Sequence, residues 1–170
     1  MMISEPMNQK LNEQIAKEFS ASHKYLAMAC DLDDKGLKIL SKFFARQCDE
    51  EREHALKLLH YVLEVGGTVE LQGVVKPPQT FSTVEEIVQA ALASEIEITK
   101  SINDIVALAE TEKDYASRSF LGWFVDEQVE EVATMRDLVQ LVQLAKGDML
   151  QVEARVRHEM MDEAKKHGHD

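Results

Sequence analysis

The sequence predicts an all-α fold: a four-helix bundle with one long crossover and a short fifth helix at the C-terminus. Composition is the first observation, because the 170 residues are 45% hydrophobic but only 6% aromatic, with three prolines. That mixture favours helices over strands. Four long segments with helical apolar spacing and one loop rich in glycine and proline are the other two observations. The length is that of one domain, expected to span residues 1–170.

The helix boundaries follow from apolar periodicity and from residues that begin or end helices. The five predicted helices span about Asn8–Asp34, Leu37–Val65, Thr83–Glu110, Asp114–Lys146 and Met149–Lys165. Gly36 and Gly147 mark breaks, as glycine often does at helix C-termini. Two overlapping capping boxes, beginning at Ser82 and Thr83, precede the third helix. The first four helices would form the bundle, about 8–146, with the fifth at about 149–165.

The segment Gly66–Phe81 is the one long connection. Fully extended, its 16 residues span at most ~55 Å, whereas a helix of about 29 residues is ~44 Å long. The segment can therefore run the length of the bundle. The short turns on either side predict two antiparallel helix pairs, which this crossover joins.

Charge and cysteine usage exclude several classes of protein. The formal net charge is −12, which repels nucleic acid and anionic membranes and attracts cations. No run of 18 apolar residues indicates a membrane span, and the polar first ten residues do not resemble a signal peptide. Cys30 and Cys48 form no CxxC motif and are expected to be small core residues. We expect a cytoplasmic protein with no nucleic-acid or membrane partner.

Each long helix carries an apolar stripe with the alternating spacing of a packed bundle. Near the middle of each helix the stripe is interrupted by side chains that can bind a metal. These six residues are Glu18, Glu51, His54, Glu95, Gln128 and Glu131. Mid-helix positions meet at one height whichever way the helices run, so the six side chains should converge in one buried layer.

The charges in this layer predict two metal ions. Four buried carboxylates carry −4, no Lys or Arg occupies the stripes to pair with them, and an unpaired buried charge costs several kcal/mol. Two divalent cations would balance the charge. Mixed carboxylate and imidazole ligands suit iron or manganese, with zinc as a competitor. A single Glu or His in a stripe is usually a boundary or core residue, but six in one layer favour a metal site.

Three motifs resemble the ferritin family. Glu50–His54 (EEREH) resembles the second-helix signature, and Phe124–Glu131 resembles the fourth-helix signature of non-haem bacterial ferritins. Glu18 followed by Tyr25 resembles the first-helix pattern. The resemblance covers nearly all of the chain and implies the ferritin-like four-helix bundle with one crossover.

The resemblance also implies roles for individual residues. The first iron would be bound by Glu18, Glu51 and His54. Glu51 would bridge to the second iron, which Glu95 and Glu131 bind, with Gln128 adjacent. Tyr25 would hydrogen-bond near Glu18 or donate an electron, unless it is an ordinary core tyrosine. A third iron site of bacterial ferritins is matched by Glu50, Glu127 and Glu130, which could instead form a solvated acidic face.

Some positions depart from related families. Arg52 stands where bacterioferritins place the haem-binding methionine, so no haem is expected. Arg118 and Leu121 stand where animal ferritins line a three-fold channel with acids, so iron is expected to arrive by another route. Trp123 matches the family and is expected to pack in the core. The terminal His167 and His169 are expected to fray rather than bind a metal.

The resemblance implies a ferroxidase. Fe(II) would be oxidised by O2 or H2O2, and Fe(III) mineral would be stored in a homo-oligomeric cage of 24 chains. Two alternatives remain open. One is a soluble di-iron peroxidase or oxygenase acting on another substrate; the other is a mineral scaffold subunit that lacks ferroxidase activity.

Overall fold

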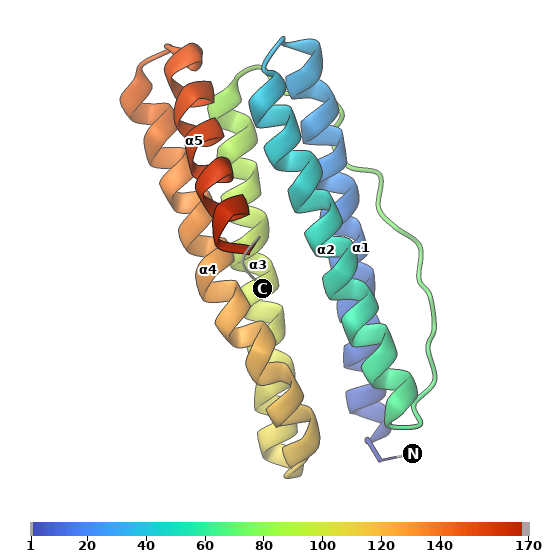
Figure 1. Cartoon of the computed structure of the whole chain (residues 1–170). Coiled ribbons are helices and arrows are strands. Elements are labelled where there is room, and N and C mark those ends of the chain that lie inside the picture. Colours follow the sequence, from blue (N-terminus) through green and yellow to red (C-terminus); the bar gives the residue numbers. More distant parts are fainter. Residues whose placement is uncertain (1, 168–170) are drawn as a thin grey trace.

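The computed structural model describes residues 2–167 and, over that range, contains five helices and no strand. The helices are α1 (Glu5–Asp34), α2 (Lys38–Glu64), α3 (Val84–Glu112), α4 (Tyr115–Ala145) and α5 (Met149–His167) (Figure 1). The predicted all-α fold with a fifth helix is confirmed. The expectation for the side chains of His167 and His169 lies outside the described residues. Within the described range, no helix has the length and apolar character needed to cross a membrane.

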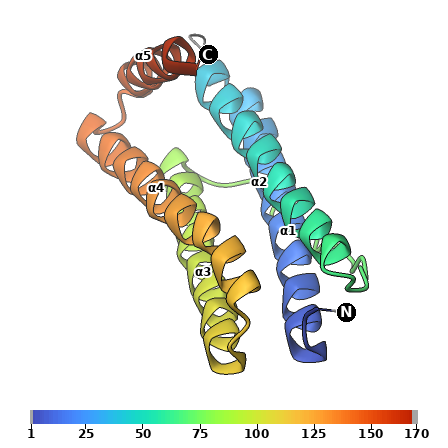
Figure 2. The ribbon, with the colours of Figure 1, turned by 60° about the horizontal axis from the view of Figure 1, so that its bottom comes forward.

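The helices form two antiparallel pairs, α1 with α2 and α3 with α4 (Figure 1). Turning the molecule shows the pairs side by side, with α5 lying across one end from α4 to α2 (Figure 2). Glu153 of α5 accepts hydrogen bonds from the backbone N–H groups of Ile39, at 2.8 Å, and Leu40, at 3.3 Å. Because α2 has no side-chain cap of its own, α5 supplies the acceptor that its N-terminus needs.

Four of the five helices start at a different residue than predicted, three of them by a single residue, and the starts of α1 and α3 show the physical reason. The first helix begins three residues earlier, at Glu5, because Ser4 accepts a hydrogen bond from the Met7 N–H at 3.1 Å. Before α3, Thr83 is the N-cap and accepts from the Glu86 N–H at 3.2 Å. Glu86 in turn accepts from the Ser82 N–H at 2.9 Å. The capping box that starts at Ser82 is therefore wrong, and the one at Thr83 reaches back one residue further than expected.

The crossover runs beside α1 (Figure 1) and is fixed to it near both ends. At the first end, Asn8 Oδ1 accepts from the Thr68 N–H at 3.0 Å. A Cβ atom at Gly67 would lie only 2.5 Å from the same oxygen, so a larger residue there would push the Asn8 side chain away from the Thr68 N–H. At the other end, Asp31 accepts from the Phe81 N–H at 3.2 Å.

The core has two apolar clusters, one toward each end of the bundle. One includes Leu11, Leu58, Ile102, Leu121 and Phe124; the other includes Tyr25, Leu40, Phe44, Ala91 and Met135. Between them lies a layer of buried polar side chains. At mid-height the bundle interior is therefore polar rather than apolar, at the positions where polar residues interrupt the apolar stripes of the sequence.

One expectation about the core is wrong. Cys30 is exposed and Cys48 is half-buried, rather than both lying in the core. Their positions along the helices were known, but the direction of each side chain depends on how the helix is rotated against its neighbours. Leu121 is fully buried within the first cluster, as its place in the apolar stripe of the fourth helix predicts, so it cannot line a channel between subunits.

Candidate metal centre

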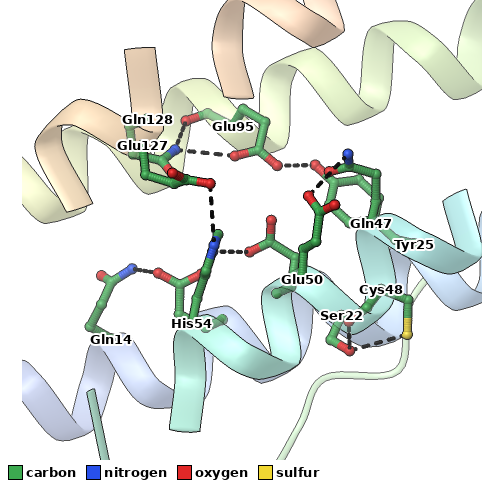
Figure 3. A network of polar contacts seen from close by, with 12 residues as sticks. Gln14, Ser22, Tyr25, Gln47, Cys48, Glu50, His54, Glu95, Glu127 and Gln128 are labelled. Atoms are coloured by element: carbon green, nitrogen blue, oxygen red, sulfur yellow. Dashed lines mark hydrogen bonds and ion pairs between the residues drawn. The ribbon is translucent and has the colours of Figure 1, made fainter. Parts of the chain in front are cut away.

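The polar layer contains side chains from all four bundle helices. They are Glu18 from α1, Glu51 and His54 from α2, Glu95 from α3, and Gln128 and Glu131 from α4, all buried. Figure 3 shows His54, Glu95 and Gln128 directed toward a shared interior. The structure thus brings together the six residues that interrupt the apolar stripes.

Two overlapping groups of side chains in this layer could each hold a metal ion. Glu18, Glu51 and His54 offer ligand atoms within 4.8 Å of one another, and so do Glu51, Glu95 and Glu131. His54 Nδ1 lies 3.5 Å from Glu51 Oε2, as the i, i+3 spacing on α2 allows. Glu51 belongs to both groups, so its carboxylate is placed to bridge two ions.

Several ligand atoms in the layer have no hydrogen-bond partner among the described residues. They are Glu18 Oε2, both carboxylate oxygens of Glu51, and His54 Nδ1. No lysine or arginine within residues 2–165 forms an ion pair with Glu18, Glu51, Glu95 or Glu131. Leaving such atoms buried and unpaired is costly. Carboxylate oxygens and an imidazole nitrogen, all aimed at one interior, fit the donor set of divalent iron.

Burial raises the pKa values of these carboxyl groups. The pKa of Glu18 is raised by desolvation and by the negative charge of Glu51. Desolvation and the charge of Glu95 raise the pKa of Glu51. The same two causes raise the pKa of Glu131 to about 9. Without a cation, protons neutralise part of this site at neutral pH; a cation would displace them.

Glu95 is held by two neighbouring side chains. The Tyr25 hydroxyl donates to Glu95 Oε1, and Gln128 Nε2 donates to Glu95 Oε2 at 3.1 Å. Burial raises the pKa of Glu95, while these two hydrogen bonds lower it. Tyr25 thus forms a hydrogen bond at the site, as expected, but its partner is Glu95 of α3 rather than Glu18 of its own helix. The hydrogen bond from the Gln128 amide nitrogen helps to orient the Glu95 carboxylate.

Glu127 joins the centre from its α4 side. Its Oε1 lies 3.8 Å from His54 Nε2, and its side chain is 26% exposed. With His54 and Glu131 it forms a third group of ligand atoms within 4.8 Å of one another. Desolvation and the charge of Glu130 raise the pKa of Glu127, despite the lowering effect of His54. Of the three residues matched to a third iron site, Glu127 is the one that contacts the candidate ligands.

The other two residues matched to that site lie further out. Glu50 is ion-paired with Arg46 at 3.0 Å, and Arg46 also binds Glu163 of α5 at 2.6 Å. Glu130 is exposed on α4. Ion binding at Glu50 would therefore compete with an existing salt bridge.

Two glutamines near the centre were not recognised from the sequence as part of the site. Gln14 is fully buried and donates to Glu18 Oε1 at 2.8 Å. Gln47 is buried, with its Oε1 lacking a partner among the described residues. Each glutamine precedes a candidate ligand by four residues, which places it on the same helix face. That spacing is the signal that could have found them.

Trp123 is 40% exposed, so the expectation that it packs in the core is wrong. Its ring lies edge-on to the His54 ring, with centroids 5.5 Å apart. Lys57 Nζ lies 4.1 Å from the centre of the indole, a cation–π contact. Trp123 therefore covers His54 from the outside rather than filling the interior.

Fold and site together define a metal-binding four-helix bundle, with candidate ligands from every helix and one long crossover. The sequence model of the ferritin-like domain family matches residues 8–145 of this chain. The chain belongs to the ferritin family.

Known relatives share most of the chain. It is 38% identical over 132 residues to a bacterial non-heme ferritin of Staphylococcus aureus, covering 78% of this chain and 80% of that protein. It is 36% identical to the corresponding protein of Staphylococcus haemolyticus over 133 residues, covering 78% and 80%. Among solved structures, an open-pore ferritin of the archaeon Archaeoglobus fulgidus matches with a TM-score of 0.89 and 36% identity, covering 92% of this chain and 96% of that one.

Proposed function

We propose that this chain is the ferroxidase-active subunit of an iron-storage cage. Glu18, Glu51 and His54 bind the first Fe(II) substrate ion, and Glu51, Glu95 and Glu131 bind the second. Gln128 and Tyr25 hold Glu95 in place. The observation that carries the proposal is the set of buried carboxylate and imidazole atoms that lack hydrogen-bond partners within the described chain. Two divalent ions would satisfy those atoms and neutralise four carboxylates at once.

A pair of adjacent Fe(II) ions suits the oxidation chemistry. Each ion gives up one electron, so two ions together supply the two electrons that reduce O2, with two protons, to H2O2. With H2O2 as oxidant, the same two electrons and two protons yield two water molecules. The protein provides ligands, spacing and a pocket that excludes water, while the electrons come from the iron. The buried carboxyl groups that lose protons as iron binds lie close to where oxygen is reduced.

Storage requires more than one chain, because a single bundle has no central cavity in which mineral could grow. We propose a hollow homo-oligomer, with 24 chains as the expected number. The names of the staphylococcal relatives support ferritin function. One similar structure is of an open-pore ferritin, and another is a closed form of that protein obtained by site-directed mutagenesis. The size of the shell openings is therefore a property to measure in this protein.

We further propose that iron reaches the site from the α2–α4 side, past Glu127. Arg118 is ion-paired with Glu110 at 3.2 Å, and Leu121 is in the core, so neither position offers an acidic channel. Glu127 combines partial exposure with contact to His54. It can pass a cation from solvent to the buried ligands.

The test combines native mass spectrometry with stopped-flow oxidation of Fe(II) by the purified protein. A cage near 24 chain masses, a fast phase that consumes two Fe(II) per chain, and later loading of hundreds of ions per cage would support storage with ferroxidase activity. A cage that loads slowly without a fast phase would indicate a scaffold subunit. A small particle that stops at two ions per chain would indicate a di-iron enzyme with another substrate.

A further inference from the structure

Gln14 lies behind Glu18, on the α1–α3 side of the candidate metal centre. Its side chain is 0% exposed, and both ends of its amide are engaged. Nε2 donates to Glu18 Oε1 at 2.8 Å, a contact visible in Figure 3, and Oε1 accepts from the Ser101 hydroxyl of α3 at 2.6 Å. The amide thus links two helices as well as touching a candidate ligand.

The hydrogen bonds continue outward to the surface. Lys17 Nζ donates to Ser101 Oγ at 2.7 Å. An ammonium group can only donate, so the serine oxygen must accept from it and direct its single proton to Gln14. The amide oxygen of Gln14 then faces Ser101, which leaves its NH2 group facing Glu18. A lysine at the surface therefore sets the direction of every hydrogen bond in this chain of four residues.

At the inner end, the two oxygens of Glu18 are in different situations. Oε1 is occupied by Gln14, whereas Oε2 has no hydrogen-bond partner among the described residues. Glu18 belongs, with Glu51 and His54, to the first group that could hold a metal. One carboxylate oxygen is thus held by the protein, and the other is left free to bind an ion.

We propose that Gln14 is a positioning residue that makes Glu18 a single-oxygen ligand, and that Ser101 and Lys17 fix the orientation of its amide. The inference rests on the proposed function, in which Glu18 binds iron. Outer partners of this kind orient metal ligands, and their loss typically costs about 10- to 100-fold in metal affinity. Without Gln14, Glu18 can rotate and chelate with both oxygens, which changes the coordination of the first ion.

The same helix seam contains a matched control. Lys24 Nζ donates to Ser94 Oγ at 3.2 Å. This pair repeats the contact between Lys17 and Ser101 two helical turns away, because Lys24 follows Lys17 by seven residues and Ser94 precedes Ser101 by seven. Among the described hydrogen bonds, none leads from Ser94 to Glu18. Ser94→Ala removes a hydroxyl from the same seam without touching the link to Glu18.

Co(II) is the probe, because its visible absorption reports the number and geometry of its ligands. The assembled full-length protein would be titrated with Co(II) without oxygen, by absorption and calorimetry, as wild type and as Q14L, S101A, S101T, S94A and E51A. Q14L is expected to weaken binding of the first ion about 10-fold and to change its absorption band. S101A should change the band in the same direction with a smaller loss of affinity. S101T, which keeps a hydroxyl, and S94A should both match the wild type.

The variants separate the two levels of the proposal. Failure of the wild type to bind two Co(II) per chain, or unchanged binding in E51A, overturns the proposed metal centre. Normal binding in the wild type with loss in E51A, but an unaltered band and affinity in Q14L, overturns only the role of Gln14. If melting curves show that Q14L does not fold, the serine variants decide. An unaltered band in S101A, or an equal change in S94A, then contradicts the inference.

Discussion

The α1–α3 and α2–α4 sides of the candidate metal centre differ in packing, exposure and charge. Along the first side, α1 and α3 approach closely, and Gln14 and Ser101 close the wall with hydrogen bonds. On the second side, no Cα atom of α2 lies within 8 Å of one in α4 over the described residues. Glu127 and Glu50 are 26% and 31% exposed there. We infer that the closed side positions ligands and the open, acidic side admits cations.

The largest expected effect comes from a ligand that both sides share. Glu51→Ala removes the carboxylate common to both groups of candidate ligands. The fast phase of Fe(II) oxidation should slow by about 100-fold or more, because loss of a residue that only orients a ligand already costs about 10- to 100-fold. The cage should still assemble, because the variant has one charge fewer to bury. Stopped-flow absorbance, with native mass as the folding control, measures both. A wild-type rate for the first two ions per chain would disprove the assignment.

The buried carboxyl group of Glu131 on α4 predicts how the stability of the metal-free protein depends on pH. In the folded chain the pKa of Glu131 is about 9, against ~4.3 in an unfolded chain. Between these two pKa values the folded protein keeps a proton on Glu131 that the unfolded chain has lost. The free energy of unfolding therefore falls as the pH rises toward 9. The melting temperature should fall by several degrees from pH 5 to pH 9, since ~1 kcal/mol shifts it by ~2–4 °C. Glu131→Gln should flatten the trend.

Added metal should reverse that trend. Ligands must lose their protons to bind a cation, so Zn(II), as a redox-inert substitute, should raise the melting temperature more at pH 8 than at pH 5. Equal stabilisation at both pH values would mean that the buried carboxyl groups do not bind the ion.

The open side should control the rate of loading rather than the chemistry. Glu127→Gln keeps the size of the side chain but removes its charge, and the fast phase should slow several-fold at low Fe(II) and recover at high Fe(II). Asp126→Asn, a neighbouring exposed position on α4, is the matched control and should have no such effect. If the two variants behave alike, access past Glu127 is not the route.

Glu130 should matter later in turnover. It is exposed on α4 and raises the pKa of Glu127, but it is absent from the groups of ligand atoms found in the described chain. Glu130→Ala is expected to preserve the first two oxidations per chain and to change multi-turnover kinetics by about two-fold. Identical progress curves over many turnovers would make Glu130 a solvated surface charge.

The smallest effect is expected at Arg118. Its guanidinium is exposed and paired with Glu110, and exposed pairs contribute little. Arg118→Asp should change the initial oxidation rate by less than about two-fold if iron arrives through the α2–α4 side. A large acceleration would instead indicate a route along the axis where three subunits meet. Leu121→Glu cannot serve as this test, because it would place a charge in the apolar core.

The sequence predicted the bundle and its polar layer because both depend on helical periodicity. Stripe residues near Glu18, Glu51 and Glu95 are buried as their spacing requires. The link between Gln14 and Ser101 joins positions 87 residues apart, and periodicity within one helix carries no information about that. For Leu121, periodicity predicts the buried position that the structure shows, whereas the matching position in animal ferritins points to a channel, so the pattern of the chain itself was the better guide.

Trp123 has an optical consequence. It is the single tryptophan of the chain, and its ring packs edge-on to His54, with the exposed face under Lys57. With excitation selective for tryptophan, the fluorescence of this protein therefore comes from one indole beside one candidate ligand of the chain. An ion that binds at His54 should quench or shift that emission, so occupancy of the candidate site can be followed in unlabelled protein and in real time.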